Sequence, residues 1–96
     1  MADLDNQQPG EHELRVSVVS ADEELWAGLA KQVIAKTTDG QIGILAGHEP
    51  VLAILAAGEV RVTTDSGEVI TANAEDGFMS VEHNRVTIVA RNASLV

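Results

Sequence analysis

The sequence predicts a small all-β domain, built as a β-sandwich or barrel. Apolar and polar residues alternate from Glu59 to Arg91, and turn residues interrupt this pattern about every eight to twelve positions. Short strands with that spacing are typical of sandwiches and barrels. The chain has 96 residues, which is the length of one domain. A domain of this size buries roughly 60–65% of its unfolded surface, enough for one modest core.

The chain begins with a polar, acidic segment, which we expect to be a disordered leader over residues 1–12. A secretory signal has a basic start and an apolar stretch, and a transit peptide is rich in Arg and poor in acids. This segment has neither composition. No run in the chain approaches the roughly 18 apolar residues that a membrane span needs.

Residues 13–20 predict the first strand, because Leu14, Val16 and Val18 occupy every second position. The next stretch, from Asp22 to Lys36, fits two structures. Its start, Ser20 to Glu23, matches a helix capping box, and apolar residues then recur at four-residue spacing. Gly28 costs about 1 kcal/mol in a helix interior, and the same residues alternate acceptably as a strand. Local pattern leaves both open.

The middle of the chain combines turn signals with short apolar runs. Asp39-Gly40 is a strong turn signal, and residues 43–50 end in a loop that contains Gly and Pro. Residues 51–57 are apolar and fit either a short helix or extended chain, and we expect this segment to end at Gly58.

Further turns are expected at three places: Asp65 to Gly67, Asp76-Gly77 and His83-Asn84. Residues 92–96 are expected as a short tail.

Composition argues against several classes of partner. The net charge is −9, with six Lys and Arg against fifteen acids, which is too few cations for a set of phosphate contacts with nucleic acid. Trp26 and Phe78 are the only aromatic residues, so stacking platforms for bases are scarce. An anionic lipid surface repels such a chain, so we expect no direct lipid insertion and, near a membrane, attachment through protein contacts. Cysteine is absent, which excludes disulfides and thiolate metal sites.

The sequence offers little catalytic chemistry. His12, His48 and His83 form no metal-binding pair at short spacing, so a metal site needs the fold to unite His48, His83 and an acid. No G-x-S-x-G is present, and Ser66 is better explained as a turn residue. The phosphate-binding pattern G-x-x-x-x-G-K-[ST] is missing as well. We expect no catalytic residue, no metal and no cofactor.

Four short motifs, in order, carry a family resemblance. They are Gly40 to Pro50 (G-Q-I-G-I-L-A-G-H-E-P), Gly58 before an apolar strand, Gly77 to Val81 (G-F-M-S-V) and Arg85 to Ala90 (R-V-T-I-V-A). In this order and spacing they resemble the epsilon subunit of the F-type ATP synthase, over about residues 13–91. Gly40 and Gly43 suit positions that need positive φ or close backbone approach.

The resemblance implies a fold and a role. The family's fold is a flattened β-sandwich of about ten short strands, which favours strand over helix for residues 26–36. The implied role is that of a non-catalytic rotor subunit, which docks the gamma subunit onto the membrane c-ring of a proton-translocating ATP synthase. It implies attachment at the cytoplasmic face of the bacterial plasma membrane, held by protein contacts.

Site residues follow from the resemblance position by position. It implies that Asp39, Gly40 and Gln41 contact the c-ring. The gamma-facing positions it implies are Ser20, His48 and Ala53.

Two departures from the family pattern stand out. Ala46 replaces the usual Pro of the loop, and the family's two C-terminal helices, which bind ATP in some members, have no counterpart before Val96. A naturally short member and a shortened chain both fit, and we expect no ATP binding by this chain. Two alternatives from other classes are a free-standing β-sandwich adaptor and a small metal-dependent hydrolase using His48 and His83.

Overall fold

The computed structural model describes residues 13–21 and 23–96, and its regular elements are all strands. The expected leader at residues 1–12 lies outside the described residues. The strands are β1 (Leu14–Ser20), β2 (Glu23–Thr37), β3 (Gly40–Leu45), β4 (Val51–Thr64), β5 (Val69–Glu82) and β6 (Arg85–Leu95). The all-β prediction is therefore confirmed.

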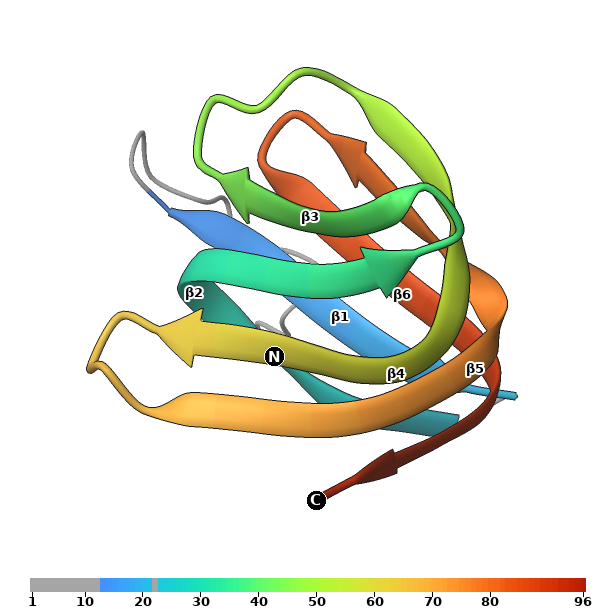
Figure 1. The fold of residues 1–96 in the computed structure, drawn as a ribbon. Coiled ribbons are helices and arrows are strands. Elements are labelled where there is room, and N and C mark those ends of the chain that lie inside the picture. Colours follow the sequence, from blue (N-terminus) through green and yellow to red (C-terminus); the bar gives the residue numbers. More distant parts are fainter. Residues whose placement is uncertain (1–12, 22) are drawn as a thin grey trace.

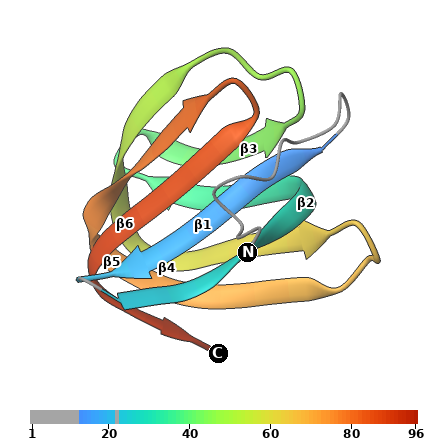
Figure 2. The ribbon, with the colours of Figure 1, turned by 180° about the vertical axis from the view of Figure 1, so that it is seen from behind.

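The strands form one sheet that closes on itself. Its order is β1-β6-β5-β4-β2-β3, and an additional pairing of β1 with β2 completes the ring. Neighbouring strands are antiparallel except β1 and β6, which are parallel. Figures 1 and 2 show the result as a flattened shell, with β2, β3 and part of β4 on one side and β1 and β6 on the other.

The number of strands differs from the expected ten because four strands are long. β2, β4, β5 and β6 contain 15, 14, 14 and 11 residues, and the ribbon of β4 and β5 bends from one layer into the other (Figure 1). Six continuous strands therefore cover both layers. Counting each long strand as two segments gives ten, so the sandwich expectation holds while the strands are fewer and longer.

At two positions where we expected a strand to end, the strand bends and continues. β4 runs through Gly58, and β5 runs through Asp76-Gly77, where we expected a turn. The pairing keeps one register on both sides of the bend, with Ile54 opposite Phe78 and Gly58 opposite Ala74. A reversal of the chain is therefore excluded here. Asp76, with a positive φ of 63°, lies at the bend, where the β4–β5 pairing skips residues 55–57 and 75–77 and then resumes in the same register.

β2 is a strand throughout. The family resemblance implied a strand here, whereas the four-residue spacing of apolar residues also fitted a helix. Its first half pairs with β1, and its second half pairs with β3 on one edge and β4 on the other. Both edges of the second half are therefore hydrogen-bonded to neighbouring strands, and this tertiary pairing overrides the local pattern. Residues 51–57, which also fitted a helix, belong to β4.

The tight turns show which residue types the backbone requires. His83 and Asn84, with φ of 49° and 62°, form the two-residue connection of β5 and β6, as expected of a primed turn. Gly40 has φ of 116°, as expected, but Gly43 has no positive φ and lies in β3 with open space where a Cβ would be. The expectation for Gly43 was therefore wrong. Residues 92–95, expected as a tail, are part of β6 and pair with β5 as far as Leu95 opposite Ala72.

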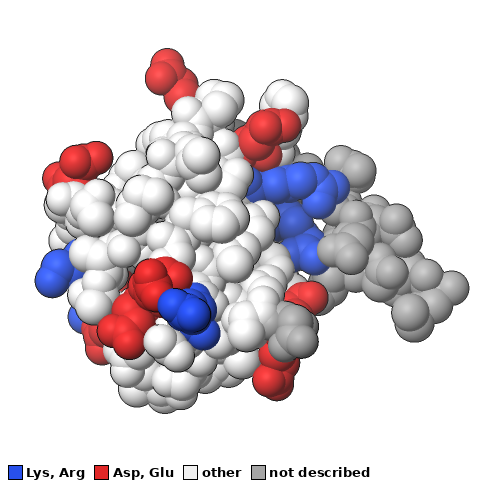
Figure 3. Space-filling model, turned by 90° about the vertical axis from the view of Figure 1, so that its right-hand side faces the viewer, with Lys and Arg blue, Asp and Glu red and all other residues white. Residues whose placement is uncertain are grey.

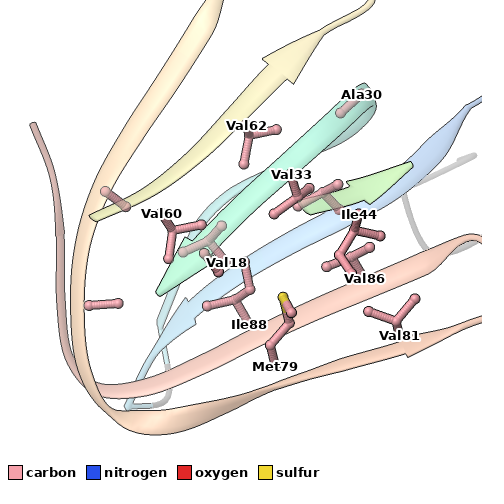
Figure 4. Packing of buried hydrophobic residues seen from close by; sticks show 14 of the residues in the cluster. Val18, Ala30, Val33, Ile44, Val60, Val62, Met79, Val81, Val86 and Ile88 are labelled. Carbon is pink, nitrogen blue, oxygen red and sulfur yellow. The ribbon is translucent and has the colours of Figure 1, made fainter. Parts of the chain in front are cut away.

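The core lies between the two layers and consists mainly of Val, Ile, Leu and Ala, with Met79 near its centre (Figure 4). These residues occupy alternate positions, so each strand turns one face inward. The largest side chains with almost no exposure are Leu14, Ile44, Met79 and Ile88. A filled core of this kind leaves the outer faces of the layers as the places where other molecules can bind.

Candidate docking surfaces

One outer face carries a row of apolar side chains. We define the apolar row as the cross-strand neighbours Ile54, Phe78, Val89 and Val19, which come from β4, β5, β6 and β1. Ile54 is 59% exposed and Phe78 is 39% exposed, while Val89 and Val19 are half-buried. Neighbouring strands lie about 4.8 Å apart, so the row extends for roughly 14 Å across the layer.

The apolar row has an uncharged side and a charged margin. On one side Leu52, 73% exposed, lies opposite Ser80, which lies opposite Thr87. On the other side Arg91 and Asp76 form an ion pair with an N–O distance of 3.6 Å. Figure 3 shows charged side chains around a broad uncharged area on this side of the molecule. Contiguous exposed apolar residues with a polar margin are typical of protein interaction sites.

The outer face of the other layer is more polar. Its outward residues are Gln32, Lys36, Arg61, Thr63, Thr71 and Asn73, together with a few apolar positions. Glu59 and Arg61 form an exposed ion pair there, 3.1 Å apart. The exposed apolar residues Leu45 and Val69 are separated by two polar neighbours along the cross-strand row, Gln32 and Thr63. Apolar surface is thus continuous on one face and scattered on the other.

β2 and β3 are joined by Thr38 and Asp39, and β3 begins with Gly40 and Gln41. Asp39, Gly40 and Gln41 are all exposed, and we call these three residues the Asp39–Gln41 turn. The hydroxyl of Thr37 donates to the Gly40 carbonyl at 2.7 Å and accepts from the Asp39 amide at 3.1 Å. The amide of Thr38 donates to the carbonyl of Ile54 at 3.0 Å. The three predicted ring-facing residues are consecutive in the sequence, and the structure shows that they are exposed and that the backbone beside them is bonded to Ile54 of the apolar row.

The three predicted gamma-facing residues do not form one cluster. Ser20, at the end of β1, pairs with Ala90, and its hydroxyl accepts from the Ala93 amide at 3.2 Å. His48 lies in the loop between β3 and β4, whose Gly47 amide donates to Asn84. Ala90 lies six positions after Asn84 along β6, which corresponds to about 20 Å at 3.3 Å per residue. Ser20 and His48 thus lie near opposite ends of the layer that carries the apolar row.

Ala53 differs from the other two. It is half-buried and lies opposite the buried Met79, so its side chain is on the inner side of β4. Its sequence neighbours Leu52 and Ile54 face outward and are the exposed residues at this position. Successive side chains of a strand face opposite sides, so residues 52 and 54 share the face opposite to that of residue 53, and this alternation was the signal that could have identified them.

Asn84 connects the β5–β6 turn, the loop between β3 and β4, and β1. The sequence predicted only that Asn84 lies in a turn. Its side-chain oxygen accepts from the Gly47 amide at 2.8 Å, and its carbonyl accepts from the Arg15 amide at 2.8 Å. The loop that contains His48 is thereby attached to the β5–β6 turn and to the start of β1. This places the loop at one end of the layer that carries the apolar row.

The same contact bears on the metal-site alternative. It brings the loops of His48 and His83 together, but no three His, Asp or Glu residues are placed to hold a metal ion within residues 13–21 and 23–96. His48 Nδ1 lies 2.8 Å from the carbonyl of Glu49, and His83 lies 3.6 Å from Glu82. The described residues also contain no helical segment that could span a membrane.

Comparison with known proteins gives consistent matches. A family model described as "ATP synthase, Delta/Epsilon chain, beta-sandwich domain" matches residues 13–96. The ATP synthase epsilon chain of Micrococcus luteus is 51% identical over 83 residues, which are 86% of this chain and 91% of that one. The epsilon chain of Frankia casuarinae is 48% identical, over 85% of this chain and 96% of that one.

Solved structures share the fold at low identity. A chain in the cryo-EM structure of the Euglena gracilis mitochondrial ATP synthase, with OSCP, F1 and c-ring, superimposes with a TM-score of 0.82 at 24% identity. The match covers 94% of this chain and 57% of that one. A chain of the Tetrahymena thermophila central stalk and c-ring superimposes with a TM-score of 0.68 at 15% identity, over 92% and 69% of the two chains.

Proposed function

Because this chain belongs to the family of ATP synthase delta and epsilon chains, and residues 13–96 match their β-sandwich domain, we propose that it is a rotor subunit of the central stalk. In this role it docks the gamma subunit onto the c-ring and transmits torque during ATP synthesis. Its curated relatives are epsilon chains, which makes it a non-catalytic subunit of the complex. The Euglena gracilis and Tetrahymena thermophila structures are both of assemblies that include a c-ring, which supports the proposed partners.

The apolar row is the observation that supports this function most strongly. A subunit that works by docking needs a surface that loses water on assembly, and burial of apolar surface contributes about 25 cal/mol per Å². Ile54 and Phe78 are exposed in the isolated chain and aligned on paired strands. We assign this face to the gamma subunit, with Ser20 and the His48 loop at its two ends and Ala53 supporting it from the inner side.

The Asp39–Gln41 turn is the proposed contact with the c-ring. It is exposed, and its backbone bond to Ile54 links it to the gamma-facing surface. A force received at the turn therefore reaches the apolar row through one hydrogen bond and the pairing of Thr37 with Leu55. The closed sheet suits this task, because closure leaves few strands free to separate under load.

The proposed location follows from the proposed partners. Attachment to a c-ring places the chain at the cytoplasmic face of a bacterial plasma membrane, held by protein contacts. The net charge of −9 disfavours direct binding to anionic lipid. We propose no bound ATP, metal or nucleic acid for this chain.

A pair of matched substitutions tests the gamma assignment. Ile54→Asp places a carboxylate in the apolar row, and Val69→Asp places one on the other layer. The two native residues are similarly exposed, Ile54 by 59% and Val69 by 53%. We expect Ile54→Asp to weaken binding to purified gamma subunit by about thirtyfold, or about 2 kcal/mol, since the charge loses its hydration on docking. Val69→Asp is expected to bind normally.

Two results count against the proposal. Equal binding by both variants removes the apolar row from the interface. Failure of the unmodified chain to copurify with gamma from native membranes, together with capture of unrelated proteins, favours the adaptor alternative. Circular dichroism of each variant separates loss of docking from loss of folding.

A further inference from the structure

A buried residue, Thr37, lies next to the exposed turn between β2 and β3 and directs its hydroxyl to that turn. Thr37 is 7% exposed and follows Val33 and Ala35 in the inward-facing series of β2. Most polar side chains in this chain are on the surface, and Arg15 is the other buried polar residue among those described. A Thr at an inward position therefore calls for a specific contact, because burial of an unsatisfied hydroxyl is unfavourable.

The contact is made with the turn itself. The hydroxyl donates to the carbonyl of Gly40 and accepts from the amide of Asp39, at 2.7 and 3.1 Å. It thus uses both its donor and an acceptor position on the backbone of the residues proposed to meet the c-ring. Thr37 is buried while its partners in the turn are exposed, so these bonds are shielded from water on the side of Thr37.

The backbone around Thr37 is held independently of its side chain. Thr37 pairs with Gly40 on one edge and with Leu55 on the other, and the next residue, Thr38, donates to Ile54. Loss of the hydroxyl alone therefore leaves the strand in place. What it releases is the conformation of the Thr38-Asp39 connection and of the Gly40 carbonyl that the hydroxyl binds.

We infer that Thr37 is a positioning residue that preorganises the Asp39–Gln41 turn for docking to the c-ring, an inference that rests on the proposed function. A turn that is already ordered in the free chain loses less conformational entropy on binding than a mobile one. Thr37 acts in this way without touching the partner.

The test compares variants that differ in the hydroxyl. Thr37→Val keeps the branched shape and removes both bonds, Thr37→Ala is a second variant without the hydroxyl, and Thr37→Ser restores it. Thr64→Val is the matched control, because the Thr64 hydroxyl lies 3.0 Å from Ser66 in the hairpin at the other end of β4. Binding of each chain, in complex with gamma subunit, is measured on detergent-purified c-rings, and NMR relaxation reports the mobility of the Asp39–Gln41 amides.

We expect Thr37→Val and Thr37→Ala to bind about fivefold more weakly and to show a more mobile turn. Thr37→Ser and Thr64→Val are expected to bind as the unmodified chain does. In a Gln41→Ala background the effect of Thr37→Val is expected to shrink, because both changes act on one contact. Such coupling is not produced by a general loss of stability.

Failure of the inference and failure of the proposed function give different results. If Gln41→Lys weakens c-ring binding but Thr37→Val does not, Thr37 has no positioning role and the docking turn stands. If Thr64→Val weakens binding as much as Thr37→Val, the effect is general loosening of the sandwich and the inference fails. If Gln41→Lys binds normally, the turn does not dock, and the proposed c-ring contact and this inference both fall.

Discussion

Gly77 lies at the bend of β5, and we predict that even a methyl group there is poorly tolerated. A Cβ added at Gly77 would lie 1.9 Å from the carbonyl oxygen of Val89 and 2.5 Å from the Cα of Ala90. Real Cβ atoms essentially never approach closer than 3.0 Å, and the atoms in the way belong to the backbone of β6. β5 and β6 therefore have to move apart beside Phe78 and Val89, two residues of the apolar row.

The expected loss follows from that displacement. Overpacking of a well-packed site costs about 1–3 kcal/mol, and a clash with backbone belongs at the upper end, so we expect about 3 kcal/mol for Gly77→Ala. For a domain of this length, 1 kcal/mol corresponds to about 4–8 °C, which gives a fall in Tm of roughly 12–24 °C. Urea unfolding followed by circular dichroism measures the free energy, and a thermal scan measures Tm.

Gly43→Ala is the matched control. Gly43 is also a strand glycine, but its Cβ would meet nothing within 4 Å. We expect this variant to be as stable as the unmodified chain, or more stable by up to about 1 kcal/mol, because Ala restricts the unfolded state. A Gly77→Ala chain within 1 kcal/mol of the unmodified chain, or a control that loses as much, refutes the close approach of β5 and β6 at the bend.

Three further predictions concern the turns and ligands. Gln41→Lys is expected to change Tm little, since an exposed substitution shifts stability by no more than about 0.5 kcal/mol, yet to impair assembly or proton-coupled synthesis. Normal coupling of this variant at several salt concentrations contradicts docking by the turn. Asn84→Ala is expected to lower the free energy of unfolding in urea by about 1–2 kcal/mol, because Ala adopts the positive φ poorly and lacks the bond to Gly47. Asn84→Gly is expected to lose less, because Gly adopts that φ freely, and equal losses rule out a backbone contribution. Calorimetry is expected to detect no ATP binding, because the sequence has no phosphate-binding motif, and binding in the micromolar to low-millimolar range overturns this.

The parts of the fold that the sequence predicted are those set by local chemistry. The turns at His83-Asn84 and Asp65 to Gly67 are visible because few residues accept the required dihedral angles. The alternation after Glu59 is visible because each strand there has one buried face. Local chemistry misled at Asp76-Gly77, where typical turn residues form a bend inside a paired strand.

Other features depend on partners that are distant in the sequence. The strand structure of β2 is decided by β1, β3 and β4, and local pattern left it open. The apolar row unites residues as far apart as Val19 and Val89, and Thr37 shows its role only through its two bonds to the turn. The family resemblance indicated the region of the docking surfaces, but it named Ala53 where the structure exposes Leu52 and Ile54.

If the apolar row binds the gamma subunit, it is covered in the assembled enzyme, and labelling of single cysteines measures this. The chain contains no cysteine, so Ile54→Cys and Val69→Cys each introduce one unique thiol. Both thiols are expected to react with a maleimide in the isolated chain, where the native residues are 59% and 53% exposed. In ATP synthase purified from native membranes, we expect Ile54→Cys to be protected while Val69→Cys still reacts. Full reactivity of Ile54→Cys in the assembled enzyme would contradict it.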